Sequence, residues 1–404
     1  MANSYLSRTP SGAGSRVKWT YSVWLKRSKI GTDQTFCSID SSGSDEIYYR
    51  FRSDNQLQVY AGIANGQVFN YRTNRLFRDV SAWYNIVIAI DTTASSGNRM
   101  KIYVNGEQET SFQSSTEMAQ DSVLAFLSGT YAIGRKNNIA GNYFDGCLSH
   151  VAFVDGQQLA PTVFGETDST SGIWKFKSPS GVTWGTNGFH LKFENSGALG
   201  TDSSGQGNTF TVNGDLKQAL DTPSNVYCTL NPLEKYAAAL TNGNTTVTNE
   251  SNNATIVLST LAVNSGKWYW EAKINDTASD TFNVGIRKTG FNNYNISEVA
   301  YGSNAWVYAV DGNIYHNGSA LLDTGTTATV GDIIGFILDL DAGTLKLKKN
   351  GADIYSGNAV VSSLNTGDYY HVHQGASQAQ VDFNFGNGFF GTSYSNKFVL
   401  PFKP

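Results

Sequence analysis

The sequence predicts an all-β protein made of two antiparallel jelly-roll β-sandwiches, which are joined by a short, turn-rich connector that also contains strands. The 404 residues include 41 Gly and 13% aromatic residues but only 7 Pro, a mixture that favours short strands and tight turns over helices. Apolar and polar residues alternate over several short segments, as in strands with one buried face. Asn-Gly pairs close two of these segments, and this pair is typical of two-residue hairpin turns.

The first sandwich is predicted over residues 19–165, after an N-terminal arm of residues 1–18. Residues 83–90 are apolar at nearly every position, as expected for a strand that is buried on both faces. Residues 100–104 alternate, and Asn105-Gly106 follows at once, which predicts a hairpin.

The second sandwich is predicted over residues 236–404. Residues 267–274 alternate, residues 333–340 form an apolar run, and residues 344–349 alternate until Asn350-Gly351 turns the chain. In the first of these strands the inward side chains are predicted to be Trp268, Trp270, Ala272 and Ile274, and the outward ones Lys267, Glu271 and Lys273.

The connector comprises residues 166–235. Its Gly-, Ser-, Asp- and Asn-rich stretch at residues 201–208 predicts turns. It also contains Trp174, Trp184, Phe189, Phe193 and Phe210, which is too much apolar surface for a free linker. We therefore expect an ordered segment that either forms a small third domain or completes the first sandwich.

Charge and hydropathy exclude several classes of partner. A net charge of −4 gives no basic surface for nucleic acid, and no apolar run is long enough to be inserted into a membrane. The polar N-terminus lacks a secretory signal, which predicts a soluble protein made in the cytoplasm. Three widely spaced cysteines, Cys37, Cys147 and Cys228, indicate neither a disulfide framework nor a zinc site.

No catalytic constellation is evident, so a non-enzymatic protein is predicted. Glycoside hydrolysis needs two carboxylates that flank the scissile bond, but Glu271 is the only carboxylate on its strand. The glycines at residues 386–391 match the spacing of a dinucleotide-binding loop, yet residues 392–396 do not continue as the helix which that loop requires.

Two segments contain possible metal ligands, but neither is predicted to bind a metal. His371 and His373 share one face of a strand and would need copies from other chains around an axis to complete a site. Residues 40–46 offer several oxygens but lack the spacing of a calcium loop. We expect no cofactor, with calcium at residues 40–46 as the alternative.

Aromatic side chains are the predicted ligand contacts, because Tyr and Trp bury a large area and keep a polar tip. We also expect about half of the aromatic residues to be core residues, since strand aromatics usually pack inward. The candidates are Tyr48, Tyr49, Tyr60 and Tyr71 in the first sandwich, and Tyr294, Tyr301, Trp306, Tyr315, Tyr369 and Tyr370 in the second.

The first sandwich resembles laminin-G and concanavalin A-like lectin domains. The resemblance rests on residues 83–90, 102–106, 144–153 and 155–156. It implies a sandwich that binds glycan or protein, in some members with a calcium ion.

The second sandwich resembles a SPRY domain. The segments that carry this resemblance occur in that family's order, at residues 266–271, 284–286, 330–341, 349–351 and 381–386. It implies a binding module without catalytic residues, whose partners dock on loops at one edge.

The connector is similar to a segment found in proteins of tailed phages, particularly marine phages. The residues concerned are 190–195, 199–208, 221–225 and 229–232. The resemblance implies a virion surface protein made in the host cytoplasm, whose partners are copies of itself, other virion proteins and a host surface glycan or protein.

We therefore expect a tail-fibre or receptor-binding adhesin, as a homotrimer. A head decoration or capsid fibre protein with a structural role is the alternative, because the first sandwich begins within about twenty residues of the N-terminus and leaves no long attachment region. A polysaccharide-degrading tailspike is a third reading, which the missing carboxylate pair disfavours.

Overall fold

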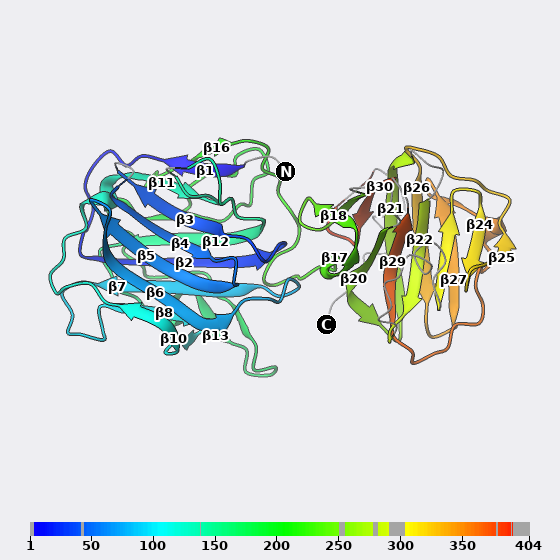
Figure 1. The fold of residues 1–404 in the computed structure, drawn as a ribbon, viewed down its shortest axis with the longest axis horizontal. Helices are drawn as coiled ribbons and strands as arrows, with labels where there is room; N and C mark the ends of the chain where they lie inside the picture. Colours follow the sequence, from blue (N-terminus) through cyan, green and yellow to red (C-terminus); the bar gives the residue numbers. More distant parts are fainter. Residues whose placement is uncertain are drawn as a thin grey trace. The chain divides into compact units, whose positions relative to one another are not determined.

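A computed structural model describes residues 4–41, 44–137, 139–249, 255–277, 282–290, 304–376, 379–388 and 390. The chain divides into two compact units, residues 1–224 (unit 1) and residues 225–404 (unit 2), which are described separately. In both units the described elements are strands and a few short 3₁₀ turns (Figure 1), so the all-β prediction is confirmed.

Unit 1 is a sandwich of an eight-stranded and a six-stranded sheet. The larger sheet has, in spatial order, β10 (Phe112–Thr116), β6 (Gly66–Leu76), β5 (Gln56–Ile63), β4 (Glu46–Phe51), β3 (Gln34–Asp40), β11 (Thr130–Ile133), β1 (Tyr5–Arg8) and β16 (Thr211–Asn213). The smaller sheet has β15 (Phe189–Leu191), β12 (Gly146–Asp155), β2 (Lys18–Arg27), β7 (Tyr84–Asp91), β8 (Met100–Val104) and β9 (Glu107–Gln108).

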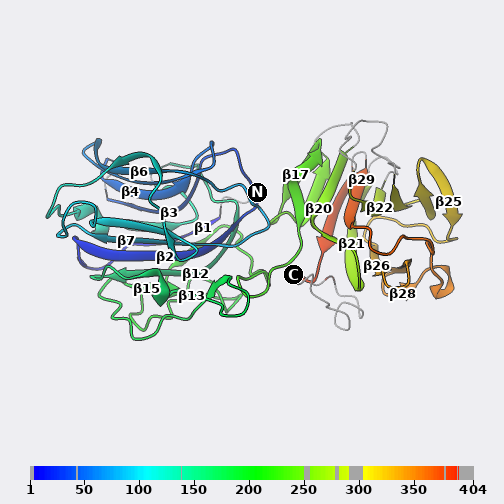
Figure 2. The same ribbon diagram turned by 90° about the horizontal axis from the view of Figure 1, so that it is seen from below.

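The two sheets lie as stacked layers, and residues 159–184 form a third layer under the six-stranded sheet (Figure 2). This third layer includes the hairpin β13 (Gly165–Thr167) and β14 (Trp174–Phe176). As a result β2 is buried on both faces: Trp19 and Tyr21 are in the core between the sheets, while Trp24 lies on the opposite side of the strand.

The structure corrects two predicted boundaries in unit 1. The expected N-terminal arm is part of the sandwich, because β1 pairs with β11 and β16. The connector supplies β15 and β16 to the two sheets, so most of it completes the first sandwich. The division between the units lies at Ser224 and Asn225, since Leu230–Tyr236 already pairs within unit 2.

Unit 2 is a sandwich of two seven-stranded sheets. One sheet contains β17 (Leu230–Tyr236), β20 (Thr255–Val263), β29 (Tyr370–Ala376), β22 (Phe282–Lys288), β23 (Ala305–Ala309), β24 (Asn313–His316) and β25 (Ser319–Asp323). The other contains β18 (Ala238–Thr241), β19 (Thr246–Asn249), β30 (Ala379–Asn384), β21 (Lys267–Thr277), β26 (Ile333–Asp339), β27 (Thr344–Lys349) and β28 (Ala352–Asp353).

The alternation predicted for β21 is correct for the core but wrong for one carboxylate. Trp270, Ala272 and Ile274 are buried as expected. Glu271 was predicted to face solvent, yet it is fully buried and accepts hydrogen bonds from the Tyr269 hydroxyl and the Asn384 amide, both at 2.9 Å. These two donors compensate for the loss of water around the carboxylate.

Gly285 on β22 lies so close to β23 that no larger residue fits there. A methyl group at this position would come within 1.9 Å of the Trp306 carbonyl oxygen. We predict that Gly285→Ala lowers the free energy of unfolding of unit 2 by about 2–3 kcal/mol, because the strands must separate. Urea denaturation checks this. Gly388→Ala, whose methyl group would meet its nearest neighbour at 3.9 Å, is the matched control, and equal stabilities of the two variants would contradict the prediction.

Candidate functional site

The outward face of the eight-stranded sheet carries polar and aromatic side chains. Its inward face carries apolar side chains, which pack in the core of unit 1. On β4 the inward positions are Ile47, Tyr49 and Phe51, so alternation turns Tyr48 and Arg50 outward. The same alternation turns Gln58, Tyr60, Asn70 and Arg72 outward on the next two strands, although Tyr48 and Gln58 are buried and the others are half-buried. We define the tyrosine–arginine face as Tyr48, Arg50, Gln58, Tyr60, Asn70 and Arg72.

Two stacked rings form the centre of the tyrosine–arginine face. Tyr48 and Tyr60 face each other across β4 and β5, with ring centroids 4.8 Å apart and planes 19° from parallel. Cations cover the other side of Tyr48, because the Arg50 guanidinium and the Lys136 ammonium lie 4.9 and 4.8 Å from its centroid. Burial raises the pKa of Tyr48 to about 12 and raises that of Tyr60, so both hydroxyls are neutral donors at pH 7.

A ladder of hydrogen bonds holds the polar groups beside these rings. The Arg50 Nε donates to Gln58 Oε1 at 2.8 Å, and the Gln58 amide donates to Asn70 Oδ1 at 2.8 Å. Arg72 is fixed by Asp54 at 3.0 Å, while its Nε is buried without a partner. Guanidinium and amide groups that are already oriented lose little entropy when they bind a ligand oxygen.

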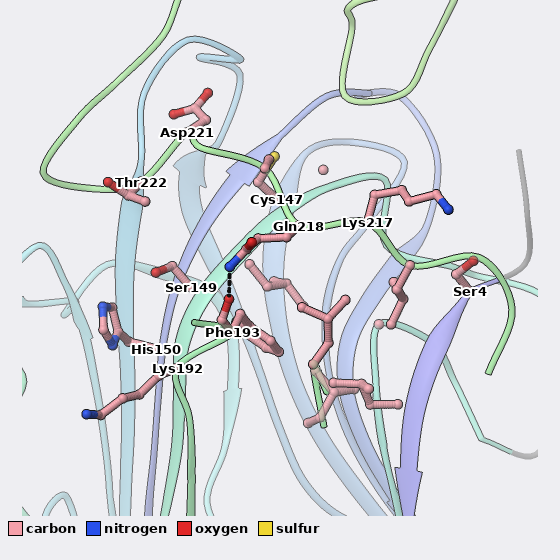
Figure 3. A pocket seen from close by; sticks show the side chains of 18 of the residues that line it. Ser4, Cys147, Ser149, His150, Lys192, Phe193, Lys217, Gln218, Asp221 and Thr222 are labelled. Carbon is pink, nitrogen blue, oxygen red and sulfur yellow. Dashed lines mark hydrogen bonds between the residues drawn. The ribbon is translucent and has the colours of Figure 1, made fainter. Parts of the chain in front are cut away.

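A groove of about 460 Å³ lies at another place in unit 1, between the open ends of the two sheets (Figure 3). Its apolar lining includes Leu6, Ile133, Phe144, Leu148, Phe193, Leu199 and Leu216, and its polar lining includes Ser149, His150, Lys192, Gln218 and Asp221. Residues 216–222 of the connector form one wall, where the Gln218 amide donates to the Phe193 carbonyl oxygen at 2.7 Å. The groove is therefore closed on one side by the connector.

A buried ion pair anchors this wall to the sandwich. Asp221 accepts from Lys26 Nζ at 2.7 Å and from Trp83 Nε1 at 2.9 Å. Burial and the carboxylate of Asp221 raise the pKa of the Cys147 thiol to about 12, which makes this groove residue a poor nucleophile at pH 7.

Next to the groove, four rings stack over the outward face of β12 and β15. His150 lies on Phe176 with centroids 3.6 Å apart, His190 lies 5.6 Å from His150, and Trp184 lies 5.6 Å from His190. Burial lowers the pKa of both imidazoles to about 4, helped by Lys192 in both cases and by His190 in the case of His150. Both rings are therefore neutral at pH 7.

In unit 2 the aromatic candidates gather on β23, β24 and the start of β29. Trp306 stacks on His316 with centroids 4.3 Å apart and meets the edge of Tyr370 at 6.0 Å. The Tyr315 hydroxyl donates to Asp311 at 2.7 Å, and Tyr369 is exposed.

Comparisons with known families match these two units separately. Residues 2–163 match the concanavalin A-like lectin/glucanases superfamily, and residues 267–388 match the SPRY domain. The chain carries a concanavalin A-like domain and a SPRY domain. No curated protein matches the chain.

Three solved structures are among those to which the chain is similar. The SPRY domain of human HERC1 is 24% identical, with a TM-score of 0.33, over 38% of this chain and 96% of that domain. The TRIM65 PSpry domain is 17% identical, with a TM-score of 0.31, over 39% of this chain and 92% of that domain. A putative carbohydrate binding protein from Bacteroides ovatus is 19% identical, with a TM-score of 0.37, over 55% of this chain and 59% of that protein.

The structure sorts the predicted ligand residues by accessibility. In the concanavalin A-like domain it brings Tyr48 and Tyr60 together on the outward face, where Tyr60 is half-buried. Tyr48 is only 7% exposed, which corrects its assignment as an accessible contact and leaves Tyr60 as the accessible ring. Tyr49 is a core residue whose hydroxyl accepts from Trp19 Nε1 at 3.1 Å, and Tyr71 is largely buried against Phe112. These two tyrosines are corrections, because their rings fill the sandwich instead of facing a ligand.

In the SPRY domain the predicted residues divide in the same way. Tyr369 is exposed, Trp306 and Tyr315 are half-buried, and Tyr370 is a core residue, which corrects its assignment as an accessible contact. Tyr294 and Tyr301 lie outside the described residues.

The polar members of the tyrosine–arginine face were missed by the sequence analysis, although a signal for them exists. Residues 46–51 and 56–60 place polar or aromatic side chains at every second position. That pattern identifies an outward face whose members lie opposite one another once the strands pair.

The metal predictions are not tested. Among the described residues no group of three or more His, Cys, Asp or Glu side chains converges. Of the proposed calcium segment, residues 42 and 43 lie outside the described residues. His371 lies with Nδ1 3.0 Å from the Ser259 carbonyl oxygen, and the side chain of His373 is outside the described set. In the described part of the chain, no helix is long and apolar enough to span a membrane.

Proposed function

We propose that the protein is a non-catalytic adhesin on the surface of a tailed-phage virion, and that it binds host surface glycan through the tyrosine–arginine face. The half-buried Tyr60 ring, which stacks on the buried Tyr48 beside the ladder of Arg50, Gln58 and Arg72, carries this proposal. Aromatic rings pack against the apolar face of a sugar, while guanidinium and amide groups bind its hydroxyl or acidic oxygens. The two domain families, which consist mainly of binding modules, support a binding role.

The virion assignment rests on the resemblance of residues 190–195, 199–208, 221–225 and 229–232 to segments of phage proteins. A shallow sugar site with a dissociation constant near 1 mM contributes only about 4 kcal/mol. A homotrimer that presents three such faces raises avidity by about 10²–10⁴. We therefore propose a homotrimeric tail-fibre subunit whose partners are other virion proteins and the host surface.

Removing one ring or one guanidinium from the face is expected to weaken glycan binding about tenfold or more. Tyr60→Ala and Arg72→Ala test this, with binding to surface polysaccharide from a susceptible host measured by biolayer interferometry. The matched controls are Tyr236→Ala, an exposed tyrosine of unit 2, and Arg78→Ala, an exposed arginine away from the face. Unchanged affinity in both test variants would place the glycan site elsewhere.

The location on the virion requires a separate experiment. Immunogold labelling of intact virions with antibody against the purified chain is expected to mark the tail tip or fibres. Label spread evenly over the head would overturn the tail-fibre assignment and indicate a decoration protein. Release of reducing sugar from the bound polysaccharide would contradict the non-catalytic assignment.

A further inference from the structure

We propose that His150 and His190 form a two-histidine binding site for a monovalent copper ion, Cu(I), in the concanavalin A-like domain. The proposal is independent of the glycan site, because it uses the six-stranded sheet and the connector instead of the tyrosine–arginine face. Neither the family matches nor the sequence pattern points to these two residues.

Strand pairing brings the two imidazoles together. In the antiparallel register of β12 and β15, Val151 pairs with Leu191 and Ala152 with His190. Val151 and Leu191 are in the core between the sheets, so His150 and His190 lie on the opposite, outward face as diagonal neighbours. Metal–nitrogen bonds of about 2.0–2.1 Å allow two imidazoles to share an ion when their donor nitrogens turn toward each other and their centroids are about 6 Å apart. The centroids of His150 and His190 are 5.6 Å apart.

Each of the two rings has a buried nitrogen without a hydrogen-bond partner. These atoms are Nδ1 of His150 and Nε2 of His190, and the His190 side chain is only 3% exposed. An unsatisfied buried polar atom costs about 1–3 kcal/mol. Two such atoms on adjacent rings indicate that a bound ligand completes them.

The backbone of β12 turns sharply at the position that presents His150. His150 has φ of 47°, a left-handed conformation that Asn, Asp and His adopt more often than other residues with a side chain. It lies within the irregularity between Ser149 and Ala152 in the pairing with β2, and such bulges redirect side chains.

The surroundings of the pair favour Cu(I) over a divalent ion. Phe176 and Trp184 cover the outer sides of the two rings. Asp202, which follows β15 along the chain, already accepts from the backbone amides of His190 and Asn208. Zinc sites in proteins use three or four protein ligands, whereas Cu(I) forms two-coordinate complexes and imidazole is a suitable ligand for copper. His150 also lines the groove of Figure 3, which gives the ion a path from solvent.

The test is anaerobic titration of the whole chain with Cu(I) in competition with bicinchoninate, followed by native mass spectrometry and X-ray absorption spectroscopy. We expect one equivalent of copper bound by two nitrogen ligands. His150→Asn keeps the positive φ that Asn tolerates, and His190→Phe keeps a ring over Trp184. Each variant is expected to lower the Cu(I) affinity about 100-fold or more, because it removes one of two ligands.

Matched controls separate this site from the other soft ligands of the chain. His316→Gln, His371→Gln and Cys147→Ser are expected to keep the full equivalent of copper. Folding of each variant is checked by its thermal unfolding midpoint. Failure of the native chain to take copper from bicinchoninate would overturn the proposal, as would retention of copper in both His150→Asn and His190→Phe.

Discussion

Lys26→Met is expected to lower the free energy of unfolding of the concanavalin A-like domain by about 3–5 kcal/mol. Lys26 and Asp221 form an ion pair at 2.7 Å, with side chains only 4% and 3% exposed. When one partner of a buried pair is removed, the other charge remains in a site without water and without its counterion. Trp83 still donates to Asp221 at 2.9 Å, but one neutral hydrogen bond does not replace the ammonium.

The double variant Lys26→Met with Asp221→Leu is the control, because it removes both charges together. Replacing a buried ion pair by apolar side chains is often close to neutral, so the double variant is expected to recover most of the lost stability. Urea unfolding of the four proteins in this double-mutant cycle gives the coupling energy. A double variant that is less stable than Lys26→Met would show that the site needs the charges themselves.

The same pair has a consequence for the groove. Asp221 is at the end of residues 216–222, which form one wall of the cavity. Loss of the anchor is therefore expected to release that wall first, before the sandwich unfolds. Hydrogen exchange of residues 216–222 should increase in Lys26→Met more than exchange of β7.

Local patterns in the sequence predicted the elements that depend on local physics. The hairpins at Asn105-Gly106 and Asn350-Gly351 were predicted correctly, because all four residues adopt positive φ, which Asn and Gly tolerate best. The prediction that Trp270 on β21 faces the core was also correct, because alternation determines which positions face inward. These features need no knowledge of distant partners.

Features that depend on distant contacts could not be predicted. Lys26 and Asp221 are 195 residues apart, and no local pattern connects them. Glu271 was placed in solvent by alternation, but a neighbouring strand supplies Asn384 and buries it. Likewise, the first residues were expected to form an arm, because nothing local to Tyr5–Arg8 shows that β11 and β16 lie on either side of it.

The candidate sites show the same division. Tyr48 and Tyr60 were predicted as ligand contacts from their residue type, whereas their arginine and glutamine neighbours were not, because the alternation that identifies these neighbours becomes a shared face only once the pairing of the strands is known. Histidine pairs were sought at a spacing of two on one strand, which selected His371 and His373. The pair with unsatisfied nitrogens instead comes from two strands that pair across 40 residues of sequence.

Acidification is expected to destabilise the concanavalin A-like domain through His150 and His190. Burial lowers the pKa of both imidazoles to about 4 in the folded chain, whereas an unfolded histidine has a pKa of about 6.5. Between these values the unfolded state binds more protons than the folded state, so stability rises with pH in this window. The stabilisation is fully present above about pH 6.5 and is lost as the pH falls toward 4.

Each unit of pKa difference corresponds to about 1.4 kcal/mol of stability. Partial exposure of His150 reduces this effect. We therefore expect protonation of the pair to lower the free energy of unfolding by about 3 kcal/mol between pH 7 and pH 4.5. Urea unfolding in buffers with chelator measures this difference. Carboxylates also titrate in this range, and the comparison of the native chain with His150→Asn/His190→Phe removes their contribution. The double variant should lose about 3 kcal/mol less than the native chain on acidification, while His316→Gln should behave like the native chain. Equal losses in the native chain and the double variant would mean that the two imidazoles accept protons without unfolding the layer of residues 159–184 that covers them.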